Sequence, residues 1–431
     1  MNNNKNIILG AGIAGLGAAY SLRNKGECAI VIEQEDTYGG LCGNFTIKGF
    51  RFDRFVHLSF TQSEEVYEIF RRSSPDMYFH KSNPFNIYKG KWIKHPAQNN
   101  LYPLSEEEKK AIISDLMSRP SNVNMDSIEN FEQWLRFQFG NYFAEHFPMR
   151  YTRKYWMNEA RDLETKWLNS KRGSRLYQPS IEEVIHGCKT TETPVTYYSK
   201  EMRYPKKGGF KSFLKILADG AEIRYKHTLT AIDPKAKTYT CKTPEGYITE
   251  NYDRLISSLP LPIMIEAMGD SVPEEVQKAA HKLRCTSGYQ VSIGLKTENI
   301  PPYLWWYIYD EDILPARAYS PSLKSPDNAP EGCSSLQLEI YCTKGKYTEK
   351  DIIRGSVERL CDLNFINRED ILFTDIRFEP FANVIFDHNV YECRDKVRDY
   401  LKSYNIDTIG RFGEWEYYWT DQSLLSGLNI K

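Results

Sequence analysis

The chain has 431 residues, enough for two or three domains built on one core, and its net charge of −1 gives no general attraction to nucleic acid or to an anionic membrane. Its nine cysteines include no CxxC pair, so the sequence predicts neither a metal site nor a disulfide framework. No run of 18 apolar residues is present, and we therefore expect no membrane span and a cytoplasmic protein.

The N-terminal stretch predicts a strand, a helix and a second strand, the βαβ unit of dinucleotide-binding folds. An apolar run at 6–9 has strand character, residues 16–25 have the pattern of a helix, and a second apolar run at 28–32 ends beside Glu33. Between the first strand and the helix lies the fingerprint Gly10-Ala11-Gly12-Ile13-Ala14-Gly15.

Each glycine of this fingerprint has its own task. Gly10 permits the tight turn, Gly12 lets the backbone approach a pyrophosphate at the helix N-terminus, and Gly15 lets the helix pack close to the strand. Glu33 is placed to bind a ribose 2′-hydroxyl. The alternative is a doubly wound domain with no ligand, but the register of strand, helix and acidic residue favours dinucleotide binding.

A second glycine turn, Gly39-Gly40, follows the second strand, and a hairpin at 49–60 carries Asp53 and His57. This arrangement resembles the FAD-binding start of the superfamily of amine oxidases, protoporphyrinogen oxidases and UDP-galactopyranose mutases. An NAD dehydrogenase has no need of the second turn, so we expect FAD. The resemblance implies cofactor contacts from Gly10, Gly12, Ala14, Gly15, Glu33, Gln34, Gly39, Gly40, Leu41, Leu229, Gly410, Arg411, Gln422 and Ser423.

The next part of the chain is predicted to be mainly helical. A helix at 63–73 and a hairpin at 86–94 come first. A capped helix with an acidic first turn then starts at Ser105, and amphipathic segments follow at 129–139 and 142–167.

Strands return after a predicted helix at 211–219. We expect short strands at 222–225, 229–232, 237–243, 247–250 and 253–259. An antiparallel sheet is then predicted from strands at 290–296, 304–309, 334–342 and 371–378, with a helix at 351–363. Near the C-terminus a strand meets a turn at Gly410, and a helix begins near Asp421, with its positive end directed at the flavin pyrimidine.

These elements predict an α/β fold with a Rossmann-like FAD-binding domain of the glutathione-reductase type. A helical insertion and an antiparallel β-sheet substrate domain complete it. We assign residues 1–85, 200–285 and 400–431 to the FAD-binding domain, 86–199 to the mainly helical insertion, and 286–399 to the substrate domain.

Several separated stretches resemble UDP-galactopyranose mutase, especially its eukaryotic type. They are Phe55-Val56-His57, Lys91-Trp92 to Gln98-Asn99-Asn100, Trp167-Leu168, Lys207-Gly208-Gly209-Phe210, Trp305 to Arg317, and the run from Gly410 to Tyr417. The wider flavin superfamily shares the first and last of these stretches, so the middle ones favour the mutase.

The resemblance implies that reduced FAD acts as a nucleophile toward a nucleotide sugar, whose pyranose and furanose forms interconvert in polysaccharide precursor synthesis. An electron donor such as NADPH would keep the flavin reduced. The implied catalytic residues are His57, Arg317, Arg411 and Tyr417. The implied substrate contacts are Trp305, Tyr307, Arg317, Lys171, Arg172, Asn383 and Tyr417.

The sequence departs from the family at three places. Phe55-Val56 replaces Gly-Gly before the histidine, the second phosphate-binding tyrosine is replaced near Phe381, and the arginine of the helical insertion is shifted to Lys171 or Arg172. A different nucleotide sugar therefore stays open. So does an FAD oxidase or desaturase of the amine oxidase type, and so does a flavoprotein without turnover. Trp305 and Trp306 fit a sheet core as well as a uridine platform.

Overall fold

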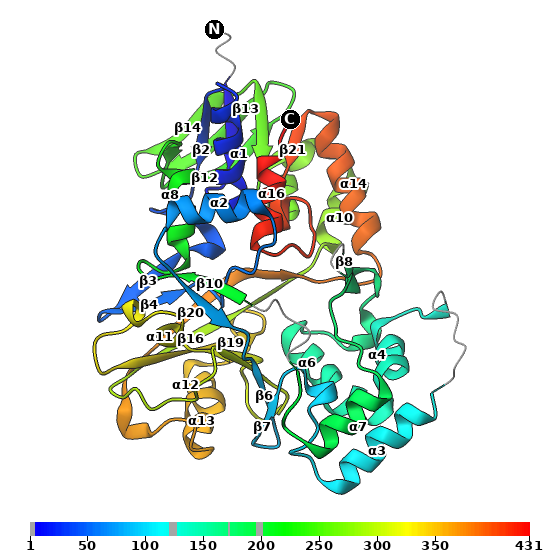
Figure 1. Ribbon diagram of the computed structural model, residues 1–431. Coiled ribbons are helices and arrows are strands. Elements are labelled where there is room, and N and C mark those ends of the chain that lie inside the picture. The colour runs from blue at the N-terminus through cyan, green and yellow to red at the C-terminus, as the bar shows by residue number, and fades with distance from the viewer. Residues whose placement is uncertain (1–4, 120–126, 171–172, 195–200) are drawn as a thin grey trace.

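The computed structural model describes residues 5–119, 127–170, 173–194 and 201–431. Five parallel strands from distant parts of the chain form the sheet in the upper part of Figure 1. Their order is β11 (Glu222–Arg224), β2 (Ala29–Ile32), β1 (Asn6–Leu9), β15 (Arg254–Ser257) and β21 (Ile406–Thr408). The central strand β1 is buried along its whole length, as a parallel strand covered on both faces should be.

The predicted βαβ unit is confirmed, and helix α1 (Ile13–Asn24) connects β1 to β2. The C-terminal helix α16 (Thr420–Leu428), which we predicted to begin near Asp421, packs against α1. The two helices approach so closely that a Cβ on Gly427 would lie 2.0 Å from the carbonyl oxygen of Ala14. The end of the chain therefore stabilises the helix that follows the first glycine turn.

A seven-stranded sheet lies below, at the lower left of Figure 1. The predicted antiparallel pairing is confirmed, except that β17 pairs with β6 in parallel. The order is β20 (Ile371–Val384), β16 (Cys285–Leu295), β19 (Ser334–Tyr341), β18 (Arg317–Tyr319), β17 (Trp305–Ile308), β6 (Phe85–Tyr88) and β7 (Lys91–Lys94).

The hairpin β6–β7 joins the edge of this sheet, although we grouped it with the helical insertion. Ile87 is fully buried in the same apolar cluster as Trp306, and this burial explains why the hairpin belongs to the sheet. The predicted mixed α/β fold class is otherwise confirmed.

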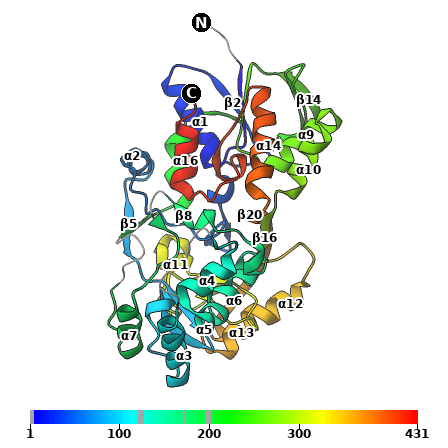
Figure 2. The same cartoon turned by 90° about the vertical axis from the view of Figure 1, so that its right-hand side faces the viewer.

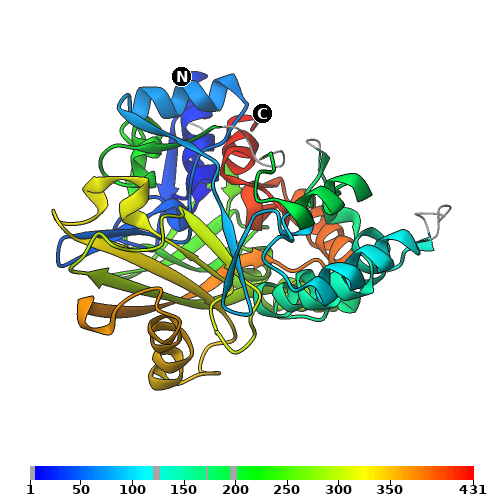
Figure 3. The ribbon, with the colours of Figure 1, turned by 60° about the horizontal axis from the view of Figure 1, so that its bottom comes forward.

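A group of helices stands beside the large sheet, as Figures 2 and 3 show. It confirms the predicted helical stretch, and its first helix has the predicted cap, because Ser105 and Glu108 form a capping box. Its members are α3 (Glu106–Met117), α4 (Phe131–Phe139), α5 (Asn141–His146), α6 (Pro148–Tyr155) and α7 (Ile181–Lys189).

Two predicted helices differ from expectation. The segment at 211–219 forms a 3₁₀ helix, η6 (Phe210–Leu214), and then one turn of α8 (Lys215–Ala218). Buried Phe210 and Phe213 are three residues apart, a spacing that suits the 3₁₀ helix. The segment at 351–363 is α12 (Glu349–Ile353) and α13 (Arg359–Asp362), joined by a π-helical turn, η9 (Arg354–Glu358).

The remaining strands and α-helices join these layers. They are β3 (Asn44–Ile47), β4 (Phe50–Asp53), α2 (Glu64–Ser73), β5 (Met77–Lys81), β8 (Asn169–Ser170), β9 (Gly173–Ser174), β10 (Glu201–Pro205), β12 (Thr228–Asp233), β13 (Thr238–Thr243), β14 (Gly246–Asn251), α9 (Leu261–Met268), α10 (Glu274–Lys282), α11 (Pro321–Lys324), α14 (Val390–Ser403) and α15 (Gly410–Gly413). Within the described ranges, each helix is too short or too polar to cross a membrane.

Candidate functional site

A cavity of about 1070 Å³ extends from the first glycine turn to the strands of the large sheet. Its walls come from the parallel sheet, from the loop after β4, from β17 to β20 and from the C-terminal segment. Segments far apart in the sequence therefore meet around one space, which suits a long ligand such as a dinucleotide beside a second molecule.

The first glycine turn forms one end of the cavity and behaves as the fingerprint predicts. Gly10 has φ +95°, and a Cβ there would lie 2.5 Å from the Ser258 hydroxyl oxygen. A Cβ on Gly15 would lie 2.0 Å from the Gly10 carbonyl oxygen, whereas a Cβ on Gly12 would meet nothing within 4 Å. Gly12 therefore leaves open space at the N-terminus of α1, where a pyrophosphate is stabilised by backbone amides.

The second glycine turn lies against the first. Gly39 and Gly40 both have positive φ, +123° and +53°, which favours glycine at both places. A Cβ on Gly40 would stand 3.2 Å from the Gly12 Cα. Side chains at these positions would occupy the backbone-lined groove that the two turns share.

Glu33 sits beside the first turn with only 7% of its surface exposed. Its Oε2 accepts a hydrogen bond from the Ala11 amide at 2.7 Å, and its Oε1 accepts one from the Glu35 amide at 2.9 Å. A carboxylate has further lone pairs, so Glu33 keeps acceptor capacity for a ribose hydroxyl. Gln34 and Leu229 line the cavity nearby.

His57 lies in the cavity wall after β4. Its Nε2 is 2.8 Å from the Leu41 carbonyl oxygen, and its ring stacks on Phe210 at 5.0 Å. Because a carbonyl only accepts, Nε2 carries the hydrogen and Nδ1 is the acceptor. Burial lowers the pKa of His57 to about 4, so the imidazole is neutral near pH 7.

Arg317 also lines the cavity, from β18, and is paired with Glu339 on β19. Glu339 is fully buried and accepts from Arg317 Nε at 2.8 Å and from the Tyr341 hydroxyl at 2.7 Å. It also accepts from the Val56 amide at 3.1 Å. Glu339 therefore connects the arginine to the loop that carries His57.

Arg411 and Asn383 occupy the wall next to the C-terminal segment. Arg411 donates from Nε to the Tyr418 carbonyl at 2.9 Å and from Nη1 to the Asn383 side-chain oxygen at 3.3 Å. The same oxygen of Asn383 accepts from the Tyr155 hydroxyl at 3.1 Å. Asn383 thus fixes the relative positions of an arginine and a tyrosine at the cavity.

Arg175 lines the cavity and was missed by the sequence prediction. Its guanidinium lies 4.2 Å from the centre of the Tyr417 ring, and its Nη2 donates to the Tyr417 carbonyl at 2.7 Å. The two basic residues we proposed instead, Lys171 and Arg172, lie outside the described residues. Three basic residues lie within five positions of the sequence here, and the sequence gives no signal that Arg175 is one that lines the cavity.

Most of the predicted site residues line this one cavity. Gly15 and Gln422 do not: Gly15 is buried within α1 against the Gly10 carbonyl, and the Gln422 side chain accepts from the Trp419 amide at 2.9 Å to cap α16. Trp305 faces the cavity, whereas Trp306 is fully buried in the sheet core, as alternation along a strand requires. The predicted residues that do line it are Gly10, Gly12, Ala14, Glu33, Gln34, Gly39, Gly40, Leu41, His57, Leu229, Trp305, Tyr307, Arg317, Asn383, Gly410, Arg411, Tyr417 and Ser423.

Comparison with known proteins agrees with this geometry. Residues 13–372 match the model of the family of flavin-containing amine oxidoreductases. The fold is similar to that of a reduced UDP-galactopyranose mutase, with a TM-score of 0.91 and 24% identity over 99% of this chain and 94% of that one. It is also similar to a candidate protoporphyrinogen oxidase from Exiguobacterium sp. 255-15, with a TM-score of 0.74 and 15% identity over 99% and 98% of the two chains.

A short segment is similar to an inactive all-trans-retinol 13,14-reductase from Danio rerio, at 51% identity over 47 residues. The match spans 11% of this chain and only 8% of that relative's length. At the identities of the two solved structures, the likeness is one of fold.

The residues present fit FAD as the cofactor. The open space at Gly12 suits the pyrophosphate, Glu33 suits a ribose, and the cavity continues past the second glycine turn to His57 with room for a flat ring system. The cofactor is FAD, and the chain belongs to the family of flavin-containing amine oxidoreductases.

Proposed function

We propose that the protein is a flavin-dependent nucleotide-sugar mutase that interconverts the pyranose and furanose forms of a sugar. The observation that carries the proposal is a pair of arginines, Arg175 and Arg317, in the wall of the same cavity as the cofactor site. A nucleoside diphosphate is a doubly charged group that arginine binds well, whereas a plain amine substrate has no use for cations.

The two arginines have different electrostatic roles. The charge of Arg317 is offset by the carboxylate of Glu339, which contacts both Nε and Nη2 of the guanidinium. Among the described residues, Nη1 of Arg317 has no hydrogen-bond partner, so this edge is available to orient a ligand. Arg175 is stacked on Tyr417 and hydrogen-bonded to backbone carbonyls, and it brings a second guanidinium to the cavity wall.

Reduced FAD, when bound, would supply the nucleophile for the anomeric carbon of the sugar. The chain's own residues position the substrate and stabilise the departing diphosphate. Neutral His57 presents Nδ1 as an acceptor for a sugar hydroxyl or a cofactor N–H, since its other nitrogen is held by Leu41. Tyr155 and Tyr417 add hydroxyl groups at the cavity wall.

An FAD-dependent oxidase or desaturase is the second candidate. Phe55, Val56 and Phe60 place apolar side chains in the cavity wall, which favours an apolar substrate. The Exiguobacterium neighbour carries an oxidase name, and this supports the same reading. A protein of this kind reacts with substrate while its flavin is oxidised, and oxygen or another acceptor takes the electrons.

Nucleotide binding tests the proposal. UDP, ADP and GDP are titrated into the FAD-loaded protein in the oxidised and in the dithionite-reduced state, and flavin fluorescence is followed. We expect saturable binding of at least one diphosphate and weaker binding of the corresponding monophosphate. If no nucleotide binds in either state, the mutase proposal fails.

A separate assay of NADPH oxidation by the FAD-loaded protein tests the proposed electron donor.

A further inference from the structure

The loop after β4 forms part of the cavity wall, and its backbone conformation is strained. We call residues 54–58 the wall loop, because all five line the cavity. Phe55 has φ +62°, a left-handed conformation that a bulky residue rarely adopts, and its ring stacks on Tyr341 at 6.2 Å. Such conformations persist only where surrounding contacts hold them, and they gather at functional sites.

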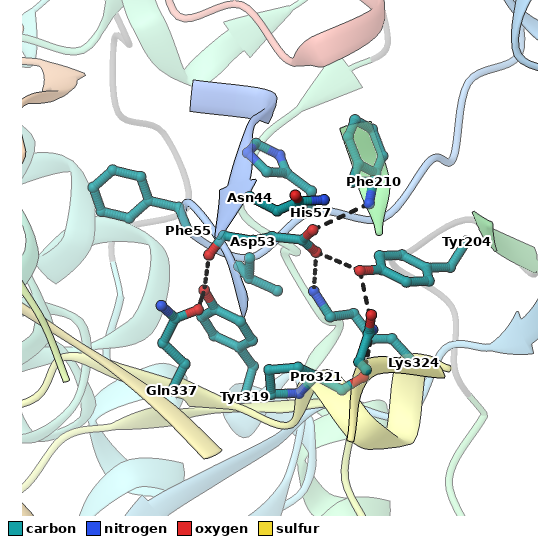
Figure 4. A network of polar contacts seen from close by, with 12 residues as sticks. Asn44, Asp53, Phe55, His57, Tyr204, Phe210, Tyr319, Pro321, Lys324 and Gln337 are labelled. Carbon is teal, nitrogen blue, oxygen red and sulfur yellow. Dashed lines mark hydrogen bonds and ion pairs between the residues drawn. The ribbon is translucent and has the colours of Figure 1, made fainter. Parts of the chain in front are cut away.

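A buried ion pair lies directly behind this loop. Asp53, the last residue of β4, and Lys324, the last of α11, have fully buried side chains, with Lys324 Nζ 2.8 Å from Asp53 Oδ2. Neither residue lines the cavity. Figure 4 shows Asp53 at the centre of the network, with Lys324 on one side and His57 on the other.

Every oxygen of Asp53 is used. The Tyr204 hydroxyl donates to Oδ2 at 2.6 Å, and the Phe210 amide donates to Oδ1 at 3.1 Å. The Asp53 carbonyl oxygen lies 3.4 Å from the Tyr319 hydroxyl, which shares its hydrogen with the Gln337 side-chain oxygen, as the dashed lines in Figure 4 mark. The residue that precedes the wall loop is therefore fixed through both its side chain and its backbone.

Stability alone does not account for such a pair. Well-packed apolar side chains often replace a buried ion pair without loss of stability, because two buried charges are costly to desolvate. We propose that Asp53 and Lys324 are positioning residues, which fix the wall loop and balance the charge behind it, so that neither oxidised nor reduced FAD is favoured by an unpaired charge. This inference rests on FAD binding and not on the mutase reaction.

Contacts across the wall support this role. The His57 ring stacks on Phe210, whose amide is bound by Asp53. After the larger effect of burial, Asp53 raises the pKa of His57, whereas Lys324 and Arg411 lower it. Burial also raises the pKa of the Cys42 thiol, Arg411 lowers it, and Asp53 raises it. The two charges of the pair therefore act with opposite sign on His57, and Asp53 also acts on Cys42.

The test uses charge removal from either side of the pair. Asp53→Asn, Lys324→Gln and the double variant are loaded with FAD, and the midpoint potential is measured by reductive titration against a reference dye. Asp53→Asn leaves Lys324 positive and should favour reduced FAD about tenfold, which raises the potential by about 30 mV for a two-electron couple. Lys324→Gln should lower it by a similar amount, and the double variant should return close to the wild-type value.

A purely structural role predicts a different result. Potentials that stay unchanged, or that move in the same direction in both single variants, would overturn the proposal. If neither single variant retains FAD, Tyr204→Phe carries the test, since it removes one hydrogen bond to Asp53 and no charge. It should lower the potential, and an unchanged value would again overturn the proposal.

A matched control is available in the helical part of the molecule. Glu108 is a largely buried carboxylate of α3 and is paired at 2.7 Å with Lys89, whose side chain is half exposed. In Figure 1, α3 lies at the bottom of the molecule, away from the parallel sheet at the top. Glu108→Gln likewise removes one carboxylate charge from an ion pair, here a pair whose lysine is half exposed. The potential of this variant should equal that of the wild type, and a shift as large as that of Asp53→Asn would show that the effect is not local.

Discussion

Arg317 and Glu339 face each other across the antiparallel strands β18 and β19, where they are direct partners in register. Glu339 Oε2 accepts from Nε at 2.8 Å and lies 2.7 Å from Nη2. This side-on pair fixes the plane of the guanidinium and removes most of its net charge from the cavity. Arg317 is therefore held in one orientation by Glu339, and Arg175 supplies a second guanidinium at the cavity wall.

The first prediction concerns Arg175. Replacement by alanine should weaken nucleoside diphosphate binding by about 1.5–3 kcal/mol, because a charge-assisted contact is lost. This corresponds to roughly a ten- to hundred-fold higher Kd. Arg175→Lys should lie between wild type and alanine, since it keeps the charge and loses the planar stack on Tyr417. Fluorescence titration measures all three, and an unchanged Kd with alanine would rule out Arg175 as the phosphate ligand.

Arg317→Ala should lower the stability of the fold as well as the affinity for nucleotides. The substitution leaves the fully buried Glu339 without its counter-charge, which costs about 3–5 kcal/mol of folding free energy. The double variant Arg317→Met with Glu339→Gln should recover much of this stability, but it should not recover nucleotide binding. Urea unfolding and nucleotide titration separate the two effects. Equal stability of Arg317→Ala and wild type would contradict the picture of a compensating pair.

The third prediction concerns the first glycine turn. Gly12 has φ −72°, so a side chain is tolerated by the backbone, and a Cβ meets no protein atom within 4 Å. Gly12→Val should therefore fold normally and yet lose FAD, since its side chain occupies the space of the pyrophosphate. Gly12→Ala should retain FAD with lower affinity. Absorbance after addition of FAD gives the occupancy, and a fully yellow Gly12→Val protein would show that the cofactor lies elsewhere.

His57 makes stability depend on pH. Its pKa falls from 6.5 in the unfolded chain to about 4 in the folded protein, so the unfolded state binds the proton more readily. Stability is complete above about pH 6.5 and falls as the pH drops toward 4, by about 2–3 kcal/mol at pH 4.5. His57→Gln should remove this part of the dependence in urea unfolding at pH 7 and pH 4.5. Exposed His281→Gln is the control, and equal slopes for both variants would contradict the assignment.

Local sequence signals predicted the two glycine turns that line the cavity. At Gly10 and Gly39 the backbone has positive φ and other atoms approach closely, and both features favour glycine. The spacing of glycines in the sequence is therefore enough to predict these turns. The same holds for the cap at Ser105. The helix at 211–219 was less well predicted, because its apolar residues fit a 3₁₀ turn as well as an α-helix.

The substrate end depends on contacts that no local pattern contains. Arg317 meets Glu339 because two strands pair in one register out of several. Arg175 enters the cavity because the hairpin β8–β9 turns it there, and two other basic residues precede it in the sequence. Asp53 and Lys324 form a buried pair although they are 271 positions apart in the sequence, so the sequence alone gives no reason to connect them.

The most direct measurement of the central claim is conversion of nucleotide sugars by the FAD-loaded protein in two redox states. A panel of nucleotide sugars is incubated with dithionite-reduced and with oxidised protein, and the products are separated by chromatography. The proposed function predicts that one sugar is converted to its ring isomer by the reduced protein alone, with no net consumption of reductant. Turnover by the oxidised protein with uptake of oxygen, and no isomer in either state, would contradict it.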